Sequence, residues 1–305
     1  MTHELLRTIW EAELESYRAE VFEIIARRMK SYRDENRGYG DIGIYIEELR
    51  SGFTLGHDAE RTELDEQGEY TGYYHTASVA KLLIAYAFYY LDDQGEVSIW
   101  DTYTDPVVGM SYQFQPTIHR MLTHSVNLNH NILLRYLGAD RLKETLRRLD
   151  LDDSRIPREI GWAPGTSDAA SLERYGTLQS PCTTPRDLGK ILAHLYRGDV
   201  LSPENNHRLL TALTNTIYNS RIPRAIGYAV PVAHKTGTKD WVYNDAALVL
   251  LPENPFVLVV LTRGAPSRVQ TLMRQIALDI FRYHQERARS GDLREAELLY
   301  ALLNA

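Results

Sequence analysis

The chain is poor in cysteine and has no excess of basic residues. Its 305 residues include one cysteine, Cys182, so no disulfide can form within the chain. No reactive motif surrounds Cys182, which we interpret as a small packed residue. The formal net charge is −7 and the isoelectric point is about 5.8, whereas nucleic-acid-binding domains usually carry a basic surface. The composition excludes an internal disulfide framework and argues against a nucleic-acid partner.

Long uninterrupted apolar runs are also missing. The sequence has neither the apolar run of a membrane span nor the shorter one of a secretory signal peptide. Residues 3–36 instead place apolar side chains at helical spacing among glutamates and arginines, which predicts an amphipathic helix. We therefore expect no membrane span. Two localisations stay open: a cytoplasmic protein as written, or an exported protein whose leader has been removed.

Several catalytic motifs are absent. There is no His-Glu-x-x-His sequence and no cysteine-histidine cluster, so His119, His124 and His130 are not predicted to bind a metal. An α/β-hydrolase would need Gly-x-Ser-x-Gly, and the nearest segment, residues 109–113, reads Gly-Met-Ser-Tyr-Gln. We expect neither a metal nor any other cofactor.

Three short motifs are present in a fixed order. They are Ser78-Val79-Ala80-Lys81, Ser125-Val126-Asn127 and Lys235-Thr236-Gly237. A Ser-x-x-Lys sequence alone occurs by chance roughly once in a chain of this length, but the ordered set of three is specific. Together the motifs predict a serine acyl-transfer site acting on a small-molecule substrate.

The residue types of the first motif suit this chemistry. A serine hydroxyl becomes a good nucleophile when a base lies within hydrogen-bond distance. Ser78 opens a strongly apolar helical run, and residues three apart share a helix face, so Lys81 can contact Ser78. Burial disfavours the ammonium form of lysine, and a helix N-terminus favours negative charge near Ser78. The chain is rich in arginine, which cannot lose its proton, so a lysine kept at this position indicates proton transfer.

With these motifs the chain resembles the penicillin-recognising serine hydrolases, and among them the class A β-lactamases. The likeness extends from about Ile42 to about Phe281. Further anchors are the segments that resemble the family's first strand and turn, its helix start after the active-site loop, and its strand after Lys-Thr-Gly: residues 42–53, 183–188 and 244–247.

The resemblance implies catalytic roles for three side chains. Ser78 would be acylated, Lys81 would activate it, and Ser125 would pass a proton to the leaving nitrogen. The backbone N–H groups of Ser78 and Thr238 would form the oxyanion hole, which binds the negative charge that develops on the substrate oxygen.

The resemblance also implies four substrate-binding residues. Asn127 would hold the substrate amide and steady the lysine of the first motif. Lys235 and Thr236 would bind the substrate carboxylate. Gly237 would allow close backbone approach on that strand.

One part of the family pattern is missing. Class A enzymes carry a loop glutamate in a Glu-x-x-Leu-Asn stretch, about seventeen residues before the Thr-Thr-Pro proline, which orients the water that hydrolyses the acyl-enzyme. Counting back from Pro185 reaches Asp168, with Glu173 and Glu159 nearby, and none of them lies in such a stretch. The alternatives are a hydrolase that uses one of these acids, a slow penicillin-binding DD-peptidase or esterase, or a sensor domain that stays acylated.

The predicted fold is α+β, often filed as α/β. It has a five-stranded antiparallel sheet flanked by N- and C-terminal helices, with an inserted, mostly helical lobe. The sheet lobe is expected at about 1–77 and 216–290, the helical lobe at about 78–215 and an extra C-terminal helix at about 291–305. Strands are expected at about 42–48, 52–57, 227–234, 243–251 and 256–262, and the last helix of the family core at about 266–284.

Three histidines lie beside the motifs in the sequence. They are His75, His124 and His234. We expect them at the rim of the cleft between the lobes, with a role in tuning charge as an alternative.

Overall fold

The computed structural model describes residues 3–36, 41–57, 73–161, 167–175, 177, 179–228, 230–265 and 267–304. In this part of the chain, the largest sheet has five strands in the order β2-β1-β9-β8-β7, and all neighbours are antiparallel. The strands are β1 (Asp41–Glu48), β2 (Phe53–His57), β7 (Val232–Lys239), β8 (Val242–Val249) and β9 (Phe256–Arg263). The predicted α+β class and five-stranded sheet are confirmed. The order places β7, which carries the third motif, at one edge of the sheet.

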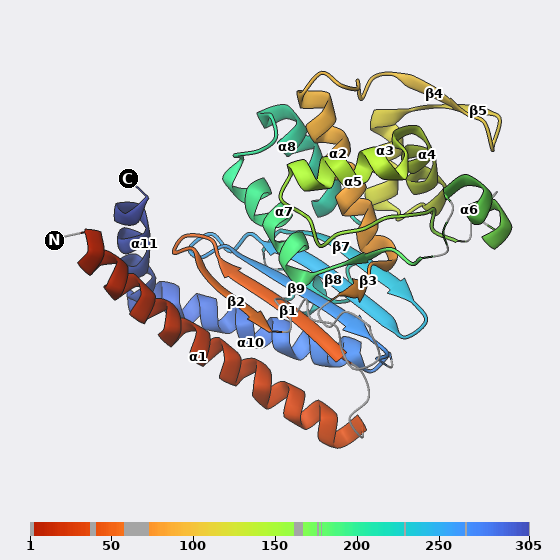
Figure 1. Ribbon diagram of the computed structural model, residues 1–305. Coiled ribbons are helices and arrows are strands. Elements are labelled where there is room, and N and C mark those ends of the chain that lie inside the picture. Colours follow the sequence, from red (N-terminus) through yellow and green to blue (C-terminus); the bar gives the residue numbers. More distant parts are fainter. Residues whose placement is uncertain are drawn as a thin grey trace.

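Helices cover both faces of this sheet (Figure 1). Two long helices, α1 (His3–Asn36) and α10 (Val269–Ser290), run along one face. The shorter helices gather on the other side: α2 (Ala80–Asp93), α3 (Phe114–Thr123), α4 (Asn127–Leu137), α5 (Ala139–Arg148), α6 (Asp168–Tyr175), α7 (Pro185–Arg197) and α8 (Pro203–Thr214). We predict that residues 1–305 form one unit, in which these helices and the sheet unfold cooperatively.

The strands are apolar on both faces because both faces are covered. In β1, Ile44 and Ile46 pack in the core cluster beneath α1 and α10, whereas Tyr45 between them packs with the shorter helices. In β9, Val259 and Val260 divide between the two clusters in the same way. Side chains alternate along a strand, so one sheet supplies one wall of each of two hydrophobic cores.

The strand that carries the third motif begins later than the sequence suggested. A strand was expected over 227–234, but β7 begins at Val232 and continues to Lys239. Gly227 and Tyr228 have left-handed φ angles of +75° and +59°, and Pro231 has no N–H to donate to a neighbouring strand. A regular strand therefore starts only after these residues, and Lys-Thr-Gly lies within it.

Smaller elements complete the described fold. β3 (Tyr74–His75) pairs with β6 (Cys182–Thr183), and β4 (Thr102–Asp105) pairs with β5 (Met110–Gln113). A short 3₁₀ turn, η1 (Ala77–Val79), precedes α2, and α9 (Ile222–Ala225) precedes β7. The last core helix, α10, ends at Ser290 and so extends beyond the predicted 266–284.

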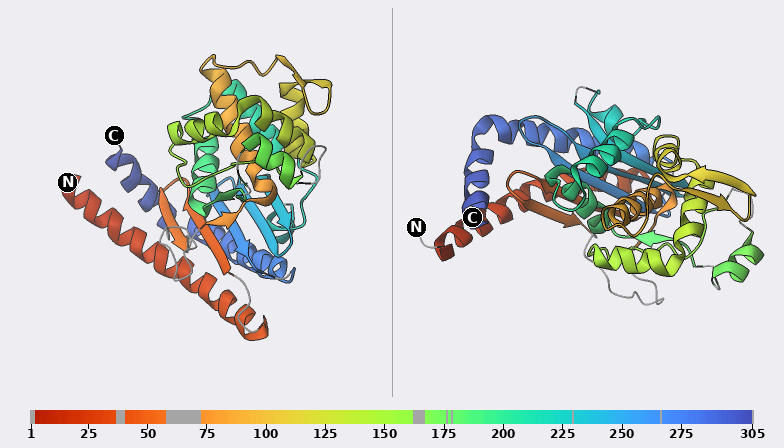
Figure 2. Two further views of the ribbon diagram at one scale, coloured as in Figure 1. Left: turned by 45° about the vertical axis from the view of Figure 1, so that its right-hand side comes forward. Right: turned by 90° about the horizontal axis from the view of Figure 1, so that it is seen from above.

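The last described helix is α11 (Asp292–Leu303). It packs against the start of α1, where the Trp10 and Tyr300 rings stack with centroids 6.5 Å apart. Figures 1 and 2 both place the two chain ends side by side. Among the helices in the described ranges, none is both long and apolar enough to cross a membrane.

Candidate active site

The first motif lies where a 3₁₀ turn meets a buried helix. Ser78 is the middle residue of η1, and Lys81 is the second residue of α2. The side chains of α2 from Ala80 to Tyr89 are buried. Ala77 has a φ angle of +45°, which is uncommon for a residue other than glycine and persists only where surrounding packing enforces it. The packing thus fixes the position of Ser78.

Lys81 is surrounded by oxygen atoms. Its Nζ is 2.7 Å from Ser78 Oγ, 2.9 Å from the Ser125 carbonyl oxygen, 3.2 Å from Ser125 Oγ and 2.7 Å from Asn127 Oδ1. The Asn127 amide is oriented by Nδ2, which donates to the Gly161 carbonyl at 3.0 Å. The two carbonyl oxygens can only accept, so a neutral amine donates its two protons to them and turns its lone pair toward a hydroxyl. This geometry suits a lysine that accepts the Ser78 proton.

The charge state of Lys81 agrees with this geometry. The side chain is fully buried. Burial, together with a smaller effect of the Lys235 charge, lowers the pKa of Lys81 to about 6. At neutral pH the amine form therefore predominates.

Ser125 connects the second and third motifs. It lies between α3 and α4 with a left-handed φ angle of +55°. Its Oγ is 3.2 Å from Lys81 Nζ and 3.0 Å from Lys235 Nζ. The Ser125 hydroxyl can therefore pass a proton between Lys81 and Lys235.

Lys235 is fully buried in β7. Its Nζ donates to Ser125 Oγ and to the Thr236 carbonyl, both at 3.0 Å. Burial lowers the pKa of Lys235 to about 7, although the Asp245 carboxylate opposes this shift, and the Arg221 charge adds to it. Lys235 is thus a cation whose charge can change near neutral pH.

Gly237 is required by a close contact between β7 and η1. A Cβ atom at this position would lie 2.7 Å from the Thr76 carbonyl oxygen and 3.1 Å from Ser78 N. Real Cβ atoms do not approach backbone this closely, so any side chain would push the strand away from Ser78. The next residue, Thr238, borders the same pocket as Ser78.

Two further residues brace the site: Arg221 contacts the third motif, and Asn244 contacts the backbone before Ser78. The Arg221 guanidinium donates to the Gly237 carbonyl at 2.9 Å, and also to the Asn244 carbonyl and to Thr238 Oγ1. The Asn244 side chain donates to the His75 carbonyl at 2.8 Å. No signal in the sequence marked Arg221, and Asn244 stood only among the anchors of the family resemblance.

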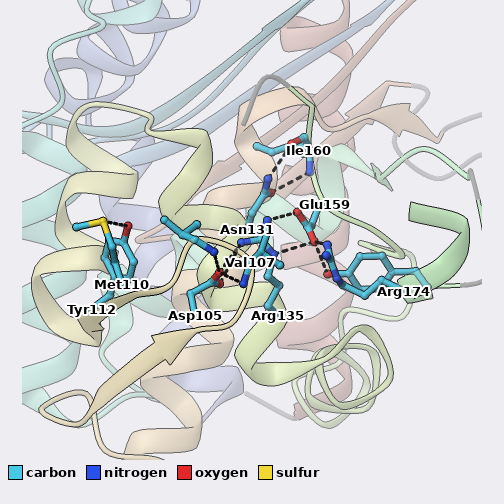
Figure 3. Close-up of polar contacts among 11 residues, drawn as sticks. Asp105, Val107, Met110, Tyr112, Asn131, Arg135, Glu159, Ile160 and Arg174 are labelled. Carbon is cyan, nitrogen blue, oxygen red and sulfur yellow. Dashed lines mark hydrogen bonds and ion pairs between the residues drawn. The ribbon is translucent and has the colours of Figure 1, made fainter. Parts of the chain in front are cut away.

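A loop is clamped onto α4 beside the nucleophile. Asn131 on α4 donates from Nδ2 to the Ile160 carbonyl and accepts from the Ile160 N–H, both at 3.0 Å. Figure 3 shows this pairing of Asn131 with Ile160. Together with the contact of Asn127 to Gly161, it fixes the backbone of residues 160–161. Ile160, Gly161 and Ser78 border one pocket of about 320 Å³.

Glu159 belongs to a buried ion-pair network. Arg135 on α4 lies between two carboxylates (Figure 3). Its Nε is 2.9 Å from Glu159 Oε1, its Nη2 is 2.5 Å from Glu159 Oε2, and its Nη1 is 3.0 Å from Asp105 Oδ2. Glu159 also accepts from Arg174, and from the Tyr175 hydroxyl at 3.1 Å. Glu159 borders the pocket that contains Ser78, but Arg135 engages both of its carboxylate oxygens and Arg174 and Tyr175 also contact Oε1, so it is poorly placed to hold a hydrolytic water.

The other two acids lie on α6. Asp168 borders the pocket that contains Ser78, and its Oδ1 is 3.7 Å from the Arg158 guanidinium. Glu173 is exposed and is not among the residues that border this pocket. Of the two acids on α6, Asp168 therefore lies nearer to Ser78.

The three histidines beside the motifs occupy different environments. His75 borders the Ser78 pocket, and burial, together with the nearby charges of Lys239 and Arg158, lowers its pKa to about 4. His124 is exposed. His234 is fully buried, so the expectation that it lies at the cleft rim was wrong. In the described residues, no group of three or more histidine, cysteine or acidic side chains could hold a metal ion.

The fold and this arrangement of side chains define a serine hydrolase of the penicillin-recognising type. The sequence pattern of the Beta-lactamase enzyme family matches residues 24–284. A β-lactamase of Streptomyces lavendulae is 26% identical over 257 residues, which cover 78% of each chain. The protein belongs to the β-lactamase enzyme family.

Solved structures share its fold. A β-lactamase from Sphaerobacter thermophilus DSM 20745 superimposes with a TM-score of 0.70 at 20% identity, over 86% of this chain and 97% of that one. An acyl-enzyme complex of a PBP-A mutant with penicillin G gives a TM-score of 0.71 at 21% identity, over 87% of this chain and 97% of that one.

Proposed function

We propose that the protein forms an acyl-enzyme on Ser78 with β-lactams or related amides and esters, and that it releases the acyl group slowly. The observation that carries this proposal is the position of Lys81, whose Nζ lies 2.7 Å from Ser78 Oγ in a fully buried setting. A lysine made neutral by burial is a suitable base for a serine hydroxyl.

The acylation step follows from these contacts. The Ser78 oxygen bonds to the substrate carbonyl carbon, and its proton passes to Lys81 Nζ. The carbon–nitrogen bond then breaks, and the leaving nitrogen takes the proton of Ser125 Oγ, which Lys81 replaces. Lys235 and Thr236 bind the substrate carboxylate, and the N–H groups of Ser78 and Thr238 bind the developing oxyanion.

Deacylation lacks the base that the family resemblance requires. A hydrolytic water needs a carboxylate within about 3 Å to take its proton. On the clamped loop, the apolar Ile160 and Glu159 border the pocket, and the Glu159 carboxylate is held by Arg135 and Arg174. Asp168 on α6 also borders the pocket, but its side chain is largely exposed and its Oδ1 lies 3.7 Å from the Arg158 guanidinium, so the backbone fixed by Asn131 does not hold it in place. The favoured outcome is acylation followed by slow release, which matches a penicillin-binding enzyme or a β-lactam sensor better than a fast β-lactamase.

The lifetime of the adduct tests this proposal. Intact-protein mass spectrometry with penicillin G should show a stoichiometric adduct that persists, and a chromogenic cephalosporin should give a burst followed by a slow phase. Ile160→Glu, which adds a carboxylate at a pocket position held by Asn131, should speed the slow phase by about tenfold or more without changing the burst. The matched control is Ile217→Glu at an exposed isoleucine outside the pocket lining. Rapid linear turnover by the wild type would contradict slow deacylation, and no adduct at all would point to a different substrate.

The acylation rate should depend on pH at both motif lysines. Lys81 is protonated below its pKa of about 6 and cannot then accept a proton. Lys235 loses its charge above its pKa of about 7 and then binds a carboxylate less well. The second-order acylation rate with penicillin G should therefore rise through about pH 6 and fall above about pH 7. An acylation rate that stays constant between about pH 5 and pH 8 would contradict the roles assigned to Lys81 and Lys235.

A further inference from the structure

The histidine before the third motif forms a buried ion pair. His234 Nδ1 is 2.9 Å from Asp245 Oδ1, and both side chains are 0% exposed. On the other side of the ring, Nε2 is 3.0 Å from Asn219 Oδ1. The Asn219 amide is oriented by its Nδ2, which donates to the Thr216 carbonyl at 2.8 Å. Both ring nitrogens of His234 therefore face oxygen acceptors, and only an imidazolium donates to both.

This pair lies directly behind Lys235. Side chains alternate along a strand, so His234 and Lys235 leave β7 on opposite faces. Asp245 on β8 is the cross-strand neighbour of Thr236, the middle residue of the motif. The Asp245 carboxylate on β8 raises the pKa of Lys235, and the Arg221 guanidinium before α9 lowers it. His234 acts on Asp245, and the Lys235 charge in turn lowers the pKa of Lys81 on α2. Asp245 is the anion of this group, and His234 is the cation that is hydrogen-bonded to it.

We propose that the His234–Asp245 pair is a positioning element for the third motif, which sets the charge on Lys235 and thereby the recognition of a substrate carboxylate. The proposal rests on the function proposed above, because it needs acylation to be observable. It assigns a role to two residues that do not touch the substrate.

The two members act on Lys235 with opposite sign. The Asp245 carboxylate stabilises the Lys235 ammonium, so Asp245→Asn should lower the Lys235 pKa. The His234 imidazolium offsets part of that carboxylate charge, so His234→Gln should leave more of it to Lys235 and raise the Lys235 pKa. A residue with a purely structural role would instead change the rate without moving the pH dependence in opposite directions.

The test is the pH profile of acylation by penicillin G, followed by mass spectrometry between about pH 5 and pH 9. The alkaline limb is the pH range in which the acylation rate falls because Lys235 loses its charge. Relative to the wild type, Asp245→Asn should shift this limb to lower pH by about one pH unit, and His234→Gln should shift it to higher pH by about the same amount. Asn219→Asp, at a partly exposed position, should also move it up because a second carboxylate then faces His234. Acylation by the neutral ester p-nitrophenyl acetate should show none of these shifts, since it offers no carboxylate to Lys235.

His284→Gln is the matched control. This imidazole is equally buried but lies on α10, where it contacts the Tyr17 hydroxyl at 3.3 Å and stacks on Phe256. It should lower stability without moving either limb. Shifts of the same sign in Asp245→Asn and His234→Gln, or an unmoved limb in Asn219→Asp, would overturn the proposal. If even the wild type forms no adduct, the proposed function itself has failed.

Discussion

Replacing Ser78 with alanine should abolish covalent adduct formation with every β-lactam and activated ester. The hydroxyl is the atom that Lys81 Nζ approaches at 2.7 Å, and no other group can replace it as nucleophile at that point. The fold should be retained, because Ser78 is partly exposed at the pocket and removing its oxygen leaves the buried α2 unchanged. Intact-protein mass spectrometry after incubation with penicillin G measures the result directly.

A second serine provides the control for that experiment. Ser111 is exposed on β5 and hydrogen-bonds Thr104 Oγ1 at 2.8 Å. It is also the serine of the segment nearest in sequence to an α/β-hydrolase elbow. Ser111→Ala should form the same adduct as the wild type, whereas an adduct on Ser78→Ala would show that the nucleophile lies elsewhere.

The contact within the first motif could be predicted because both of its residues belong to one short helical segment. Ser78 and Lys81 are one helical turn apart, and helical geometry alone brings such a pair into contact. The meeting of the three motifs did not follow from spacing. It depended on the family resemblance, since Lys235 and Ser125 are joined only by the way the sheet edge packs against the helices.

The loop could not be predicted by counting along the chain. The family spacing pointed to Asp168, but the backbone held beside Ser78 belongs to Ile160. The position of the Ile160 backbone is set by Asn131 on α4, and nothing in the sequence distinguishes this asparagine from the neighbouring ones. Contacts of this kind depend on tertiary packing, which loop length does not specify.

The environment of His234 was mispredicted because it was inferred from the position of this histidine next to Lys235 in the sequence. Neighbouring residues of a strand point to opposite faces of the sheet, so only one of the two can face the cleft. In β7, which continues to Lys239, His234 lies inside the sheet, and Asp245 on the neighbouring strand makes its burial tolerable. Adjacency in the sequence thus gave no sign of the ion pair on the opposite face.

Lys81→Arg should slow acylation by about 10² or more, which is the usual contribution of a general base. Arginine keeps the positive charge and a similar length but cannot give up its proton, so it cannot accept one from Ser78. A planar guanidinium also fits poorly where a single nitrogen meets oxygens of Ser78, Ser125 and Asn127. Acylation by penicillin G over a range of pH provides the measurement.

The pH profile separates a lost base from a distorted site. If Lys81 is the base, the limb near pH 6 should disappear in Lys81→Arg, because the group that titrates there has been removed. Lys190→Arg makes the same exchange at a lysine that pairs with Asp150 at the surface and should leave both rate and profile unchanged. A Lys81→Arg variant that acylates within a few-fold of the wild type and keeps the limb near pH 6 would place the base on another group. Loss of rate with that limb retained would mean that Lys81 holds Ser78 in position but does not take its proton.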